Sequence, residues 1–119
     1  MIGNRILIVD TNVIVYCAVR KIDLLAAVRA MHEHYLPILL DCIMEEIRHI
    51  GISEIERNIA LKLAERFEIL DSSGSGDDCI INFATEKKAA VLSNDLNLRR
   101  ILKAAGIRTY SLRQGKMIE

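Results

Sequence analysis

Short apolar runs alternate with longer segments of helical periodicity along the whole of this 119-residue chain. Runs of the length and composition of buried strands occupy residues 6–9, 37–40, 67–70, 90–93 and 107–110. Helical patterns fill residues 13–19, 23–35, 42–50, 53–65, 77–88 and 96–105, and Ser53 with Glu56 has the spacing of a capping box. Regular alternation of this kind favours a parallel sheet between helices. We therefore expect an α/β fold, a three-layer α/β/α sandwich with a central, mainly parallel sheet.

Composition and length indicate one folded domain over residues 1–119. Hydrophobic residues make up 51% of the chain, with one Pro and no Trp, which is typical of a compact domain and not of a disordered tail. The longest apolar runs are too short to span a membrane. The first of them, residues 6–9, is ended by Asp10 and does not resemble a signal peptide. We expect a cytoplasmic protein with no membrane partner.

The three cysteines form no CxxC pair, and each lies in an apolar-rich segment: Cys17, Cys42 and Cys79. Such cysteines usually act as small hydrophobic residues, so we expect all three to be reduced and buried. A zinc site that combines them with the three histidines lacks ligand-pair spacing.

The formal net charge is zero, but the charges are unevenly distributed. Residues 84–119 contain eight Lys or Arg and three acids, whereas residues 1–83 contain eight basic and thirteen acidic residues. This asymmetry suits a site that holds cations on one side and a phosphate backbone on the other, although chance alone explains it equally well.

Two aspartates follow predicted strands directly. Asp10 comes after residues 6–9, and Asp95 lies just beyond residues 90–93. In open parallel sheets ligands bind at the carboxyl ends of the strands, so both are expected at one edge. Each also has a local explanation. Asn12 is a good N-cap for a helix from residue 13, so that Asp10 simply ends its strand, and Asp95 is a good N-cap for the helix at 96–105.

Helical geometry separates two pairs of neighbouring acids. In the helix at 42–50, Glu46 lies at the margin of the apolar stripe and Glu45 points away from it. In the helix at 77–88, Asp77 lies beside the apolar face and Asp78 almost opposite. A partly dehydrated carboxylate needs a cation or a donor to compensate it. Both aspartates also favour the dipole of their helix, and for Asp78 this explanation is as good as a role in a site.

These acids converge on one sheet edge, where carboxylates repel one another unless a cation compensates them. Ser93 and Asn94 beside Asp95 offer groups that orient carboxylates or water. Oxygen-only ligands favour Mg²⁺ or Mn²⁺ over zinc.

The order and spacing of four segments resemble the PIN-domain nucleases. These segments are ILIVDTNVIV, DCIMEEIRHI, DDCIINFA and VLSNDLNLRRILKAAGIRTYSL, and together they cover nearly the whole chain. The resemblance implies an acidic quartet, with all four members proposed as metal ligands, at Asp10, Glu46, Asp77 and Asp95. It implies supporting roles for Asn12 and Ser93, and Asp78 matches an extra acid found in some members only.

The resemblance also implies endonucleolytic hydrolysis of RNA phosphodiester bonds with Mg²⁺ or Mn²⁺ as cofactor. Basic residues late in the chain are candidates for binding RNA phosphates, although an ordinary solvated face explains them at least as well; they are Arg99, Arg100, Lys103 and Arg113. PIN nucleases include toxins of the VapC type, which a small antitoxin holds inactive, and processing factors for ribosomal RNA. Homodimers are common in the family, and the helices at 23–35 or 53–65 are candidate contacts.

Two other functions remain open at this point. The first is a non-catalytic module that binds RNA or a partner. The second is an aspartyl phosphotransfer domain, in which a strand also ends in Asp. The phosphotransfer hydrolases need a second acid two residues later, where this chain has Asn12, and receiver domains need an acid pair earlier in the chain, where residues 1–5 contain none. We rank this last.

Overall fold

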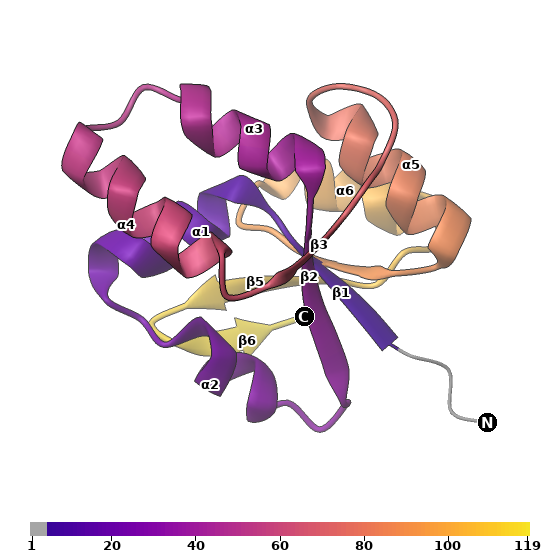
Figure 1. Cartoon of the computed structure of the whole chain (residues 1–119). Helices are drawn as coiled ribbons and strands as arrows, with labels where there is room; N and C mark the ends of the chain where they lie inside the picture. Colours follow the sequence, from indigo (N-terminus) through magenta and orange to yellow (C-terminus); the bar gives the residue numbers. More distant parts are fainter. Residues whose placement is uncertain (1–4) are drawn as a thin grey trace.

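A six-stranded sheet forms the centre of the protein (Figure 1). The computed structural model describes residues 5–119. Strands β1 to β5 pair in parallel and β6 pairs antiparallel with β5, in the order β3-β2-β1-β4-β5-β6. The strands are β1 (Arg5–Val9), β2 (Tyr35–Leu40), β3 (Glu68–Leu70), β4 (Ala90–Leu92), β5 (Thr109–Arg113) and β6 (Lys116–Ile118).

Helices cover both faces of this sheet, which confirms the predicted mainly parallel α/β sandwich. Figure 1 shows α5 and α6 on one side and the other helices on the opposite side, where α1 packs mostly against α4. The helices are α1 (Thr11–Arg20), α2 (Leu24–Arg29), α3 (Asp41–His49), α4 (Glu54–Ala64), α5 (Asp77–Lys87) and α6 (Leu96–Ala104). In the part of the chain described, the longest helices have 11 residues, and none is long and apolar enough to cross a membrane.

Strand β1 lies at the middle of the sheet, between β2 and β4. Leu7, Ile8 and Val9 are completely buried because helices cover both faces. From β1 the chain first builds β2 and β3 on one side and then crosses to add β4 and β5 on the other. The strand order therefore reverses between β1 and β4, which is where parallel α/β sheets bind ligands.

Two elements differ from the sequence-based expectation. The helix predicted over residues 23–35 ends at Arg29, because Tyr35 already pairs with Arg5 in the sheet and needs an extended backbone. Strand β6 was not predicted. It turns back from β5 through Gln114 and Gly115, whose positive φ angles of 52° and 78° suit a two-residue hairpin turn. The predicted capping box of Ser53 and Glu56 is confirmed at the start of α4.

Candidate active site

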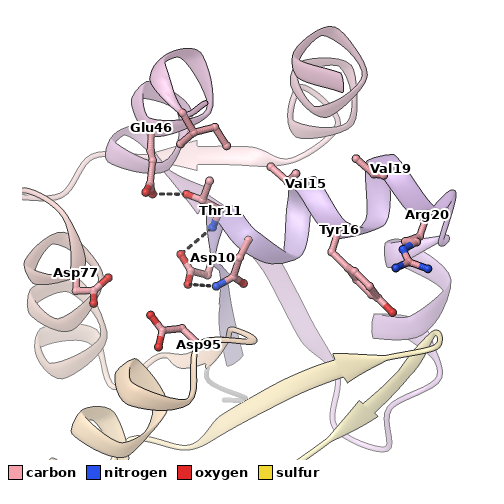
Figure 2. Close-up of a pocket in the computed structure, with 11 residues that line it drawn as sticks. Asp10, Thr11, Val15, Tyr16, Val19, Arg20, Glu46, Asp77 and Asp95 are labelled. Carbon is pink, nitrogen blue, oxygen red and sulfur yellow. Dashed lines mark hydrogen bonds between the residues drawn. The ribbon is translucent and has the colours of Figure 1, made fainter. Parts of the chain in front are cut away.

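A pocket of about 530 Å³ opens at the edge of the sheet where β1 and β4 end (Figure 2). Asp10 follows β1, Glu46 lies on α3, Asp77 begins α5, and Asp95 precedes α6. All four predicted acids line this one pocket, although they are far apart in sequence. The other lining residues are Thr11, Asn12, Val15, Tyr16, Val19, Arg20 and Ile50.

Asp10 is the most firmly held of the four acids. Its side chain is buried, with only 7% of the residue exposed, and it caps α1 by accepting a 2.7 Å hydrogen bond at Oδ1 from the Thr11 backbone N–H. The other oxygen, Oδ2, accepts a 2.7 Å bond from the Ser93 hydroxyl and a 3.3 Å bond from the Asn12 amide. Asp10 is therefore the N-cap of α1, and the alternative that Asn12 caps this helix is wrong. These hydrogen bonds hold the Asp10 carboxylate in one orientation.

Burial raises the pKa of Asp10 from 3.8 to about 6. The hydrogen bonds from Ser93 and Thr11 oppose this shift, while the negative charges of Glu46 and Asp77 add to it. The chain thus keeps a carboxylate in a position that disfavours its charged form. A group that stabilises negative charge at this point would remove the unfavourable free energy.

Ser93 and Asn12 connect the ends of β1 and β4. The Ser93 hydroxyl is fully buried and also accepts a 3.0 Å bond from the Asp95 backbone N–H. Asn12 accepts a 3.1 Å bond at Oδ1 from the Asn94 backbone N–H. Asp95 caps α6 by accepting bonds at Oδ1 from two backbone N–H groups. Asp95 is therefore the N-cap of α6, and it also lines the pocket.

Glu46 and Asp77 are held less tightly than Asp10. The Thr11 hydroxyl donates a 2.6 Å hydrogen bond to Glu46 Oε1, a contact that the sequence did not indicate. Glu46 is exposed as a residue, although its hydrogen bond with Thr11 is partly buried. Asp77 is exposed as well, and its pKa is raised, first by partial burial and then by the charges of Asp95 and Glu46, with Asp78 contributing least. Glu45 points away, as expected, and pairs with Arg48 and His49 on the surface.

Negative charge in the pocket is not neutralised by basic side chains. Within residues 5–119, no ion pair joins any of the four acids to Lys, Arg or His. Their oxygen atoms are also spread out, because among the described residues no three of the four place an oxygen within 4.8 Å of one another. Mg²⁺ typically keeps several waters and takes one or two carboxylates directly. The arrangement fits such an ion, with the remaining acids acting through water.

Asp78 and the candidate phosphate-binding residues lie outside this pocket. Asp78 is exposed in the first turn of α5 and is absent from the pocket lining. Arg99 Nη1 donates a 2.7 Å hydrogen bond to the Ser93 carbonyl, so it supports the end of β4. The other three are exposed but do not line the pocket; they are Arg100, Lys103 and Arg113. The sequence missed Arg20, which does line it and which follows Asn12 by eight residues on the same face of α1.

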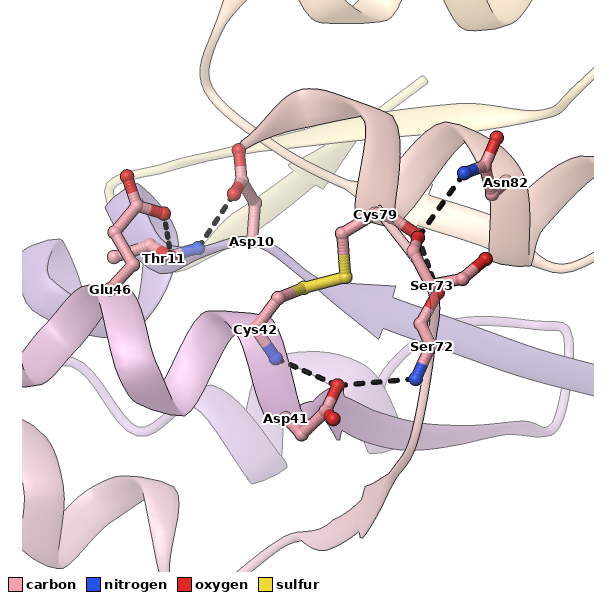
Figure 3. Close-up of a disulfide and its surroundings, with 9 residues drawn as sticks. All are labelled: Asp10, Thr11, Asp41, Cys42, Glu46, Ser72, Ser73, Cys79 and Asn82. Atoms are coloured by element: carbon pink, nitrogen blue, oxygen red, sulfur yellow. Dashed lines mark hydrogen bonds between the residues drawn. A yellow bond between two sulfur atoms is a disulfide. The ribbon is translucent and has the colours of Figure 1, made fainter. Parts of the chain in front are cut away.

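A disulfide joins Cys42 on α3 to Cys79 on α5 (Figure 3). The expectation that all three cysteines are reduced is therefore wrong for this pair, and holds only for Cys17, which is buried and free. Burial raises the pKa of the Cys17 thiol to about 12. The two bridged residues are 37 positions apart in sequence with Cα atoms 6.6 Å apart. Their pairing depends on how two helices meet, which spacing along the chain does not reveal.

The disulfide is close to two of the acids. Cys42 lies one helical turn before Glu46, and Cys79 lies two residues after Asp77. The same region is held by Asp41, whose Oδ1 accepts bonds of 2.9 and 3.1 Å from the backbone N–H groups of Cys42 and Ser72. The link thus fixes the relative position of the two helices that carry Glu46 and Asp77.

Residues 7–115 match the family described as PIN like domain. The chain is 37% identical to the "rRNA-processing protein fcf1" of Schizosaccharomyces pombe, over 92% of this chain and 60% of that protein. It is 29% identical to "Ribonuclease VapC9" of Archaeoglobus fulgidus, over 96% of this chain and 87% of that protein.

A solved structure has a similar fold. It is described as "Structure of the PIN domain endonuclease Utp24" and superposes with a TM-score of 0.76 at 37% identity, covering 94% of this chain and 88% of the other. The likeness extends over nearly all of the chain.

Proposed function

This chain belongs to the PIN-like domain family, and from that premise we propose that it is a divalent-metal-dependent endoribonuclease. The observation that carries the proposal is the pocket in which Asp10, Glu46, Asp77 and Asp95 meet without a basic partner within the described residues. Unpaired carboxylates that share one pocket repel one another and lower stability unless a cation is bound. We infer that this cost is retained because the site holds Mg²⁺ or Mn²⁺.

The donor set fits a hard cation. Every candidate ligand in the pocket is a carboxylate oxygen, with hydroxyl and amide oxygens beside it and no sulfur or imidazole among the residues that line it. Such ligands suit Mg²⁺ and Mn²⁺. Asp10 is the primary ligand in this proposal, Asp95 and Asp77 complete the site directly or through water, and Glu46 approaches from the opposite wall.

Three of the acids then have distinct tasks. Asp10 cannot rotate, because both of its oxygens accept hydrogen bonds, so it fixes the position of the cation. Glu46 has one oxygen held by the Thr11 hydroxyl, which leaves the other to orient the attacking water or to accept its proton. Asp77 accepts no hydrogen bond among the residues described, and it is free to adjust when a cation and substrate arrive.

The reaction is hydrolysis of an RNA phosphodiester bond. Water oxygen forms a bond to phosphorus in line with the departing 3′ oxygen, the bond between phosphorus and that oxygen breaks, and the 3′ oxygen takes up a proton. The products end in a 5′-phosphate and a 3′-hydroxyl. When bound, the divalent cation supplies positive charge beside the phosphate and promotes loss of the water proton.

Cleavage of labelled RNA tests the proposal. We expect the purified protein to cut single-stranded RNA with Mg²⁺ or Mn²⁺ and to be inactive with EDTA, with activity restored by adding the ion back. Cleavage that persists after complete chelation would reject the metal-dependent mechanism. A protein that binds RNA but never cuts it under any metal condition would instead be the non-catalytic module.

Two neighbouring glutamates provide a matched pair for the same assay. Glu46→Gln removes a pocket carboxylate, and we expect a loss of at least about a hundredfold in kcat, the order found for groups that act in the transition state. Glu45→Gln removes the same charge one residue away, where it only pairs with Arg48 and His49, so cleavage should change less than about twofold. Equal effects of the two substitutions would contradict the assignment.

The comparisons favour a processing-type role over a toxin role. Identity is 37% to both the rRNA-processing protein and the Utp24 domain, against 29% to VapC9. The chain spans only 60% of the length of the rRNA-processing protein. We propose that its substrate is ribosomal RNA and that it acts in the cytoplasm. A toxin would be encoded beside a small antitoxin, so the neighbouring reading frame separates the two roles.

We also propose that residues 1–119 form a single domain that pairs as a homodimer through α4. Of the two helices named as candidate contacts, α4 exposes the larger apolar surface, because Ile55 is 73% and Ile59 is 44% exposed on one face. Sedimentation of the wild type and of the double substitution Ile55→Ser, Ile59→Ser measures this contact. A monomer in the wild type at high concentration would reject it.

A further inference from the structure

Helix α1 presents a second, partly exposed stripe beside its core face, with apolar side chains between a polar and a basic end. The core face is buried and consists of Thr11, Val13, Ile14, Cys17 and Ala18. The second stripe follows the spacing i, i+3, i+4, i+7 and i+8 and consists of Asn12, Val15, Tyr16, Val19 and Arg20. All five of these residues line the pocket that contains the acids. Within this stripe Val15 and Tyr16 are partly buried against the core, whereas Asn12, Val19 and Arg20 are exposed.

The stripe leads away from the acids in one continuous hollow. Asn12 lies beside Asp10 at the start of α1. Figure 2 shows Arg20 at the far end of the same helix, eight residues after Asn12. At 1.5 Å per residue, these positions are about 12 Å apart along the helix axis. A strand whose phosphate is positioned at the acids therefore has its neighbouring nucleotide next to this stripe.

Arg20 is the basic end of the pocket. Of the described residues that line the pocket, it alone carries a positive charge, and its exposed guanidinium makes no ion pair with any described acid. An unpaired guanidinium binds a phosphate through two parallel hydrogen bonds. The pocket thus has carboxylates at one end and a phosphate-binding group at the other, which is complementary to a nucleic acid backbone crossing it.

Tyr16 lies between these ends and is held in position. The Gln114 backbone N–H donates a 3.3 Å hydrogen bond to the Tyr16 hydroxyl, which ties the side chain to the turn between β5 and β6. Its ring is half-buried, with Val15 before it and Val19 one turn later. An ordered aromatic ring beside apolar side chains is the surface on which an unpaired nucleic acid base stacks.

We propose that the second stripe of α1 is a nucleotide subsite, in which Tyr16 and Val19 contact the base next to the scissile bond of single-stranded RNA and Arg20 binds its phosphate. This assignment rests on the proposed endoribonuclease function and names the form of its substrate. A base paired in a duplex has no free face for Tyr16. The subsite therefore requires an unpaired base beside the scissile bond.

Steady-state cleavage of a single-stranded RNA and of the same strand annealed to its complement tests the subsite. Tyr16→Leu keeps an apolar side chain but removes stacking, so KM for the single strand should rise about tenfold with little change in kcat. Tyr16→Phe keeps the ring and should restore the wild-type KM. An abasic nucleotide next to the cut should weaken wild-type binding and leave Tyr16→Leu unaffected.

Arg20 is tested by charge. Arg20→Gln should raise KM about fivefold and reduce the slope of log affinity against log salt by about 0.7, the value of one single-strand phosphate contact. Arg29→Gln is the matched control, because Arg29 is also exposed in the last turn of a helix but lies outside the pocket. Its KM and salt slope should equal those of the wild type.

The outcomes separate the two proposals. Wild-type protein that cuts RNA while Tyr16→Leu and Arg20→Gln retain both KM and salt slope overturns the subsite and leaves the nuclease intact. Equal cleavage of single and double strands overturns it as well. Wild-type protein that never cuts RNA with any divalent ion overturns the nuclease proposal itself. Melting temperatures of the variants, expected within a few degrees of the wild type, exclude unfolding as the cause of a raised KM.

Discussion

The pocket has two walls that are built in different ways. One wall is the Asp10 corner, where β1, β4 and the first turn of α1 hold a single carboxylate by short hydrogen bonds. The other wall consists of α3 and α5, which carry Glu46 and Asp77 and are joined by a disulfide. The first wall is fixed by the sheet and the second by a covalent link between helices. Both walls therefore hold their helices in place, and the Asp77 side chain, which accepts no hydrogen bond among the described residues, is left to adjust when a cation and a substrate bind.

The largest expected effect is that of Asp10→Asn, which removes the anchor and nearly preserves its shape. We expect cleavage to fall by about a thousandfold or more, because a charge that stabilises the transition state is lost. The fold should remain, since Asn is a good N-cap for α1. Circular dichroism and RNA cleavage measured on the same sample check both parts. Cleavage at the wild-type rate would contradict the anchor role.

Removing the disulfide tests the second wall. Replacing Cys42 and Cys79 by Ser should lower the free energy of unfolding by about 3–4 kcal/mol, the chain-entropy cost for a loop of this length. It should also raise the Mg²⁺ concentration needed for half-maximal activity, since Glu46 and Asp77 are no longer held at a fixed spacing. Urea denaturation and metal titration measure the two effects.

Reductant provides the control for that experiment. It should reproduce both changes in the wild type and change nothing in the double serine variant. If the wild type and the variant need the same Mg²⁺ concentration, the link contributes to folding stability alone and does not position the acids.

The pH dependence of stability distinguishes the buried acid from the exposed ones. The pKa of Asp10 is raised in the folded state to about 6, so folding favours its protonated form. In the metal-free protein this contribution to stability is fully present below about pH 4 and is lost as the pH rises through about 6. It amounts to roughly 2–3 kcal/mol at most, at 1.36 kcal/mol for each pKa unit.

Denaturation of the metal-free protein between pH 4 and 8 measures this term. The wild type should lose stability across the window, and Asp10→Asn should lose less because it has no charge to bury. Saturating Mg²⁺ should reduce the difference. An identical pH profile for the two proteins would show that Asp10 is not dehydrated.

The sequence predicted which acids meet in the pocket, by a different argument for each wall. Asp10 and Asp95 were predicted to share an edge because each follows a strand, and strand order alone brings them together. The choice of Glu46 over Glu45 and of Asp77 over Asp78 followed from helical periodicity. These four acids do line one pocket.

What the sequence did not reveal depends on tertiary packing. The pairing of Cys42 with Cys79 and the bond from Thr11 to Glu46 join elements that are 37 and 35 residues apart, and neither has a local signal. The exposure of Glu46 is a further feature that helical periodicity did not indicate. The stripe of Tyr16 and Arg20 did have a signal, because residues 13–19 are apolar on every face and a helix at the surface needs only one apolar face.

Ser93→Ala should produce the smallest of these effects. It removes the buried hydroxyl that donates to Asp10 and accepts from the Asp95 backbone. Loss of such a supporting group typically lowers metal affinity or activity by tenfold or more, and we expect about tenfold. Ser93→Thr keeps the hydroxyl and is the matched variant for the activity assay. A loss as large as that of Asp10→Asn would mean that Ser93 itself contacts the cation or the substrate.

Calorimetric titration of the metal-free protein with Mn²⁺ tests most directly whether the four carboxylates form a cation site. Wild type and Glu45→Gln should bind the ion with the same affinity, and Asp10→Asn should bind at least tenfold more weakly or not at all. Equal Mn²⁺ affinity in wild type and Asp10→Asn would contradict the account, because the buried carboxylate at the end of β1 would then have no cation to hold.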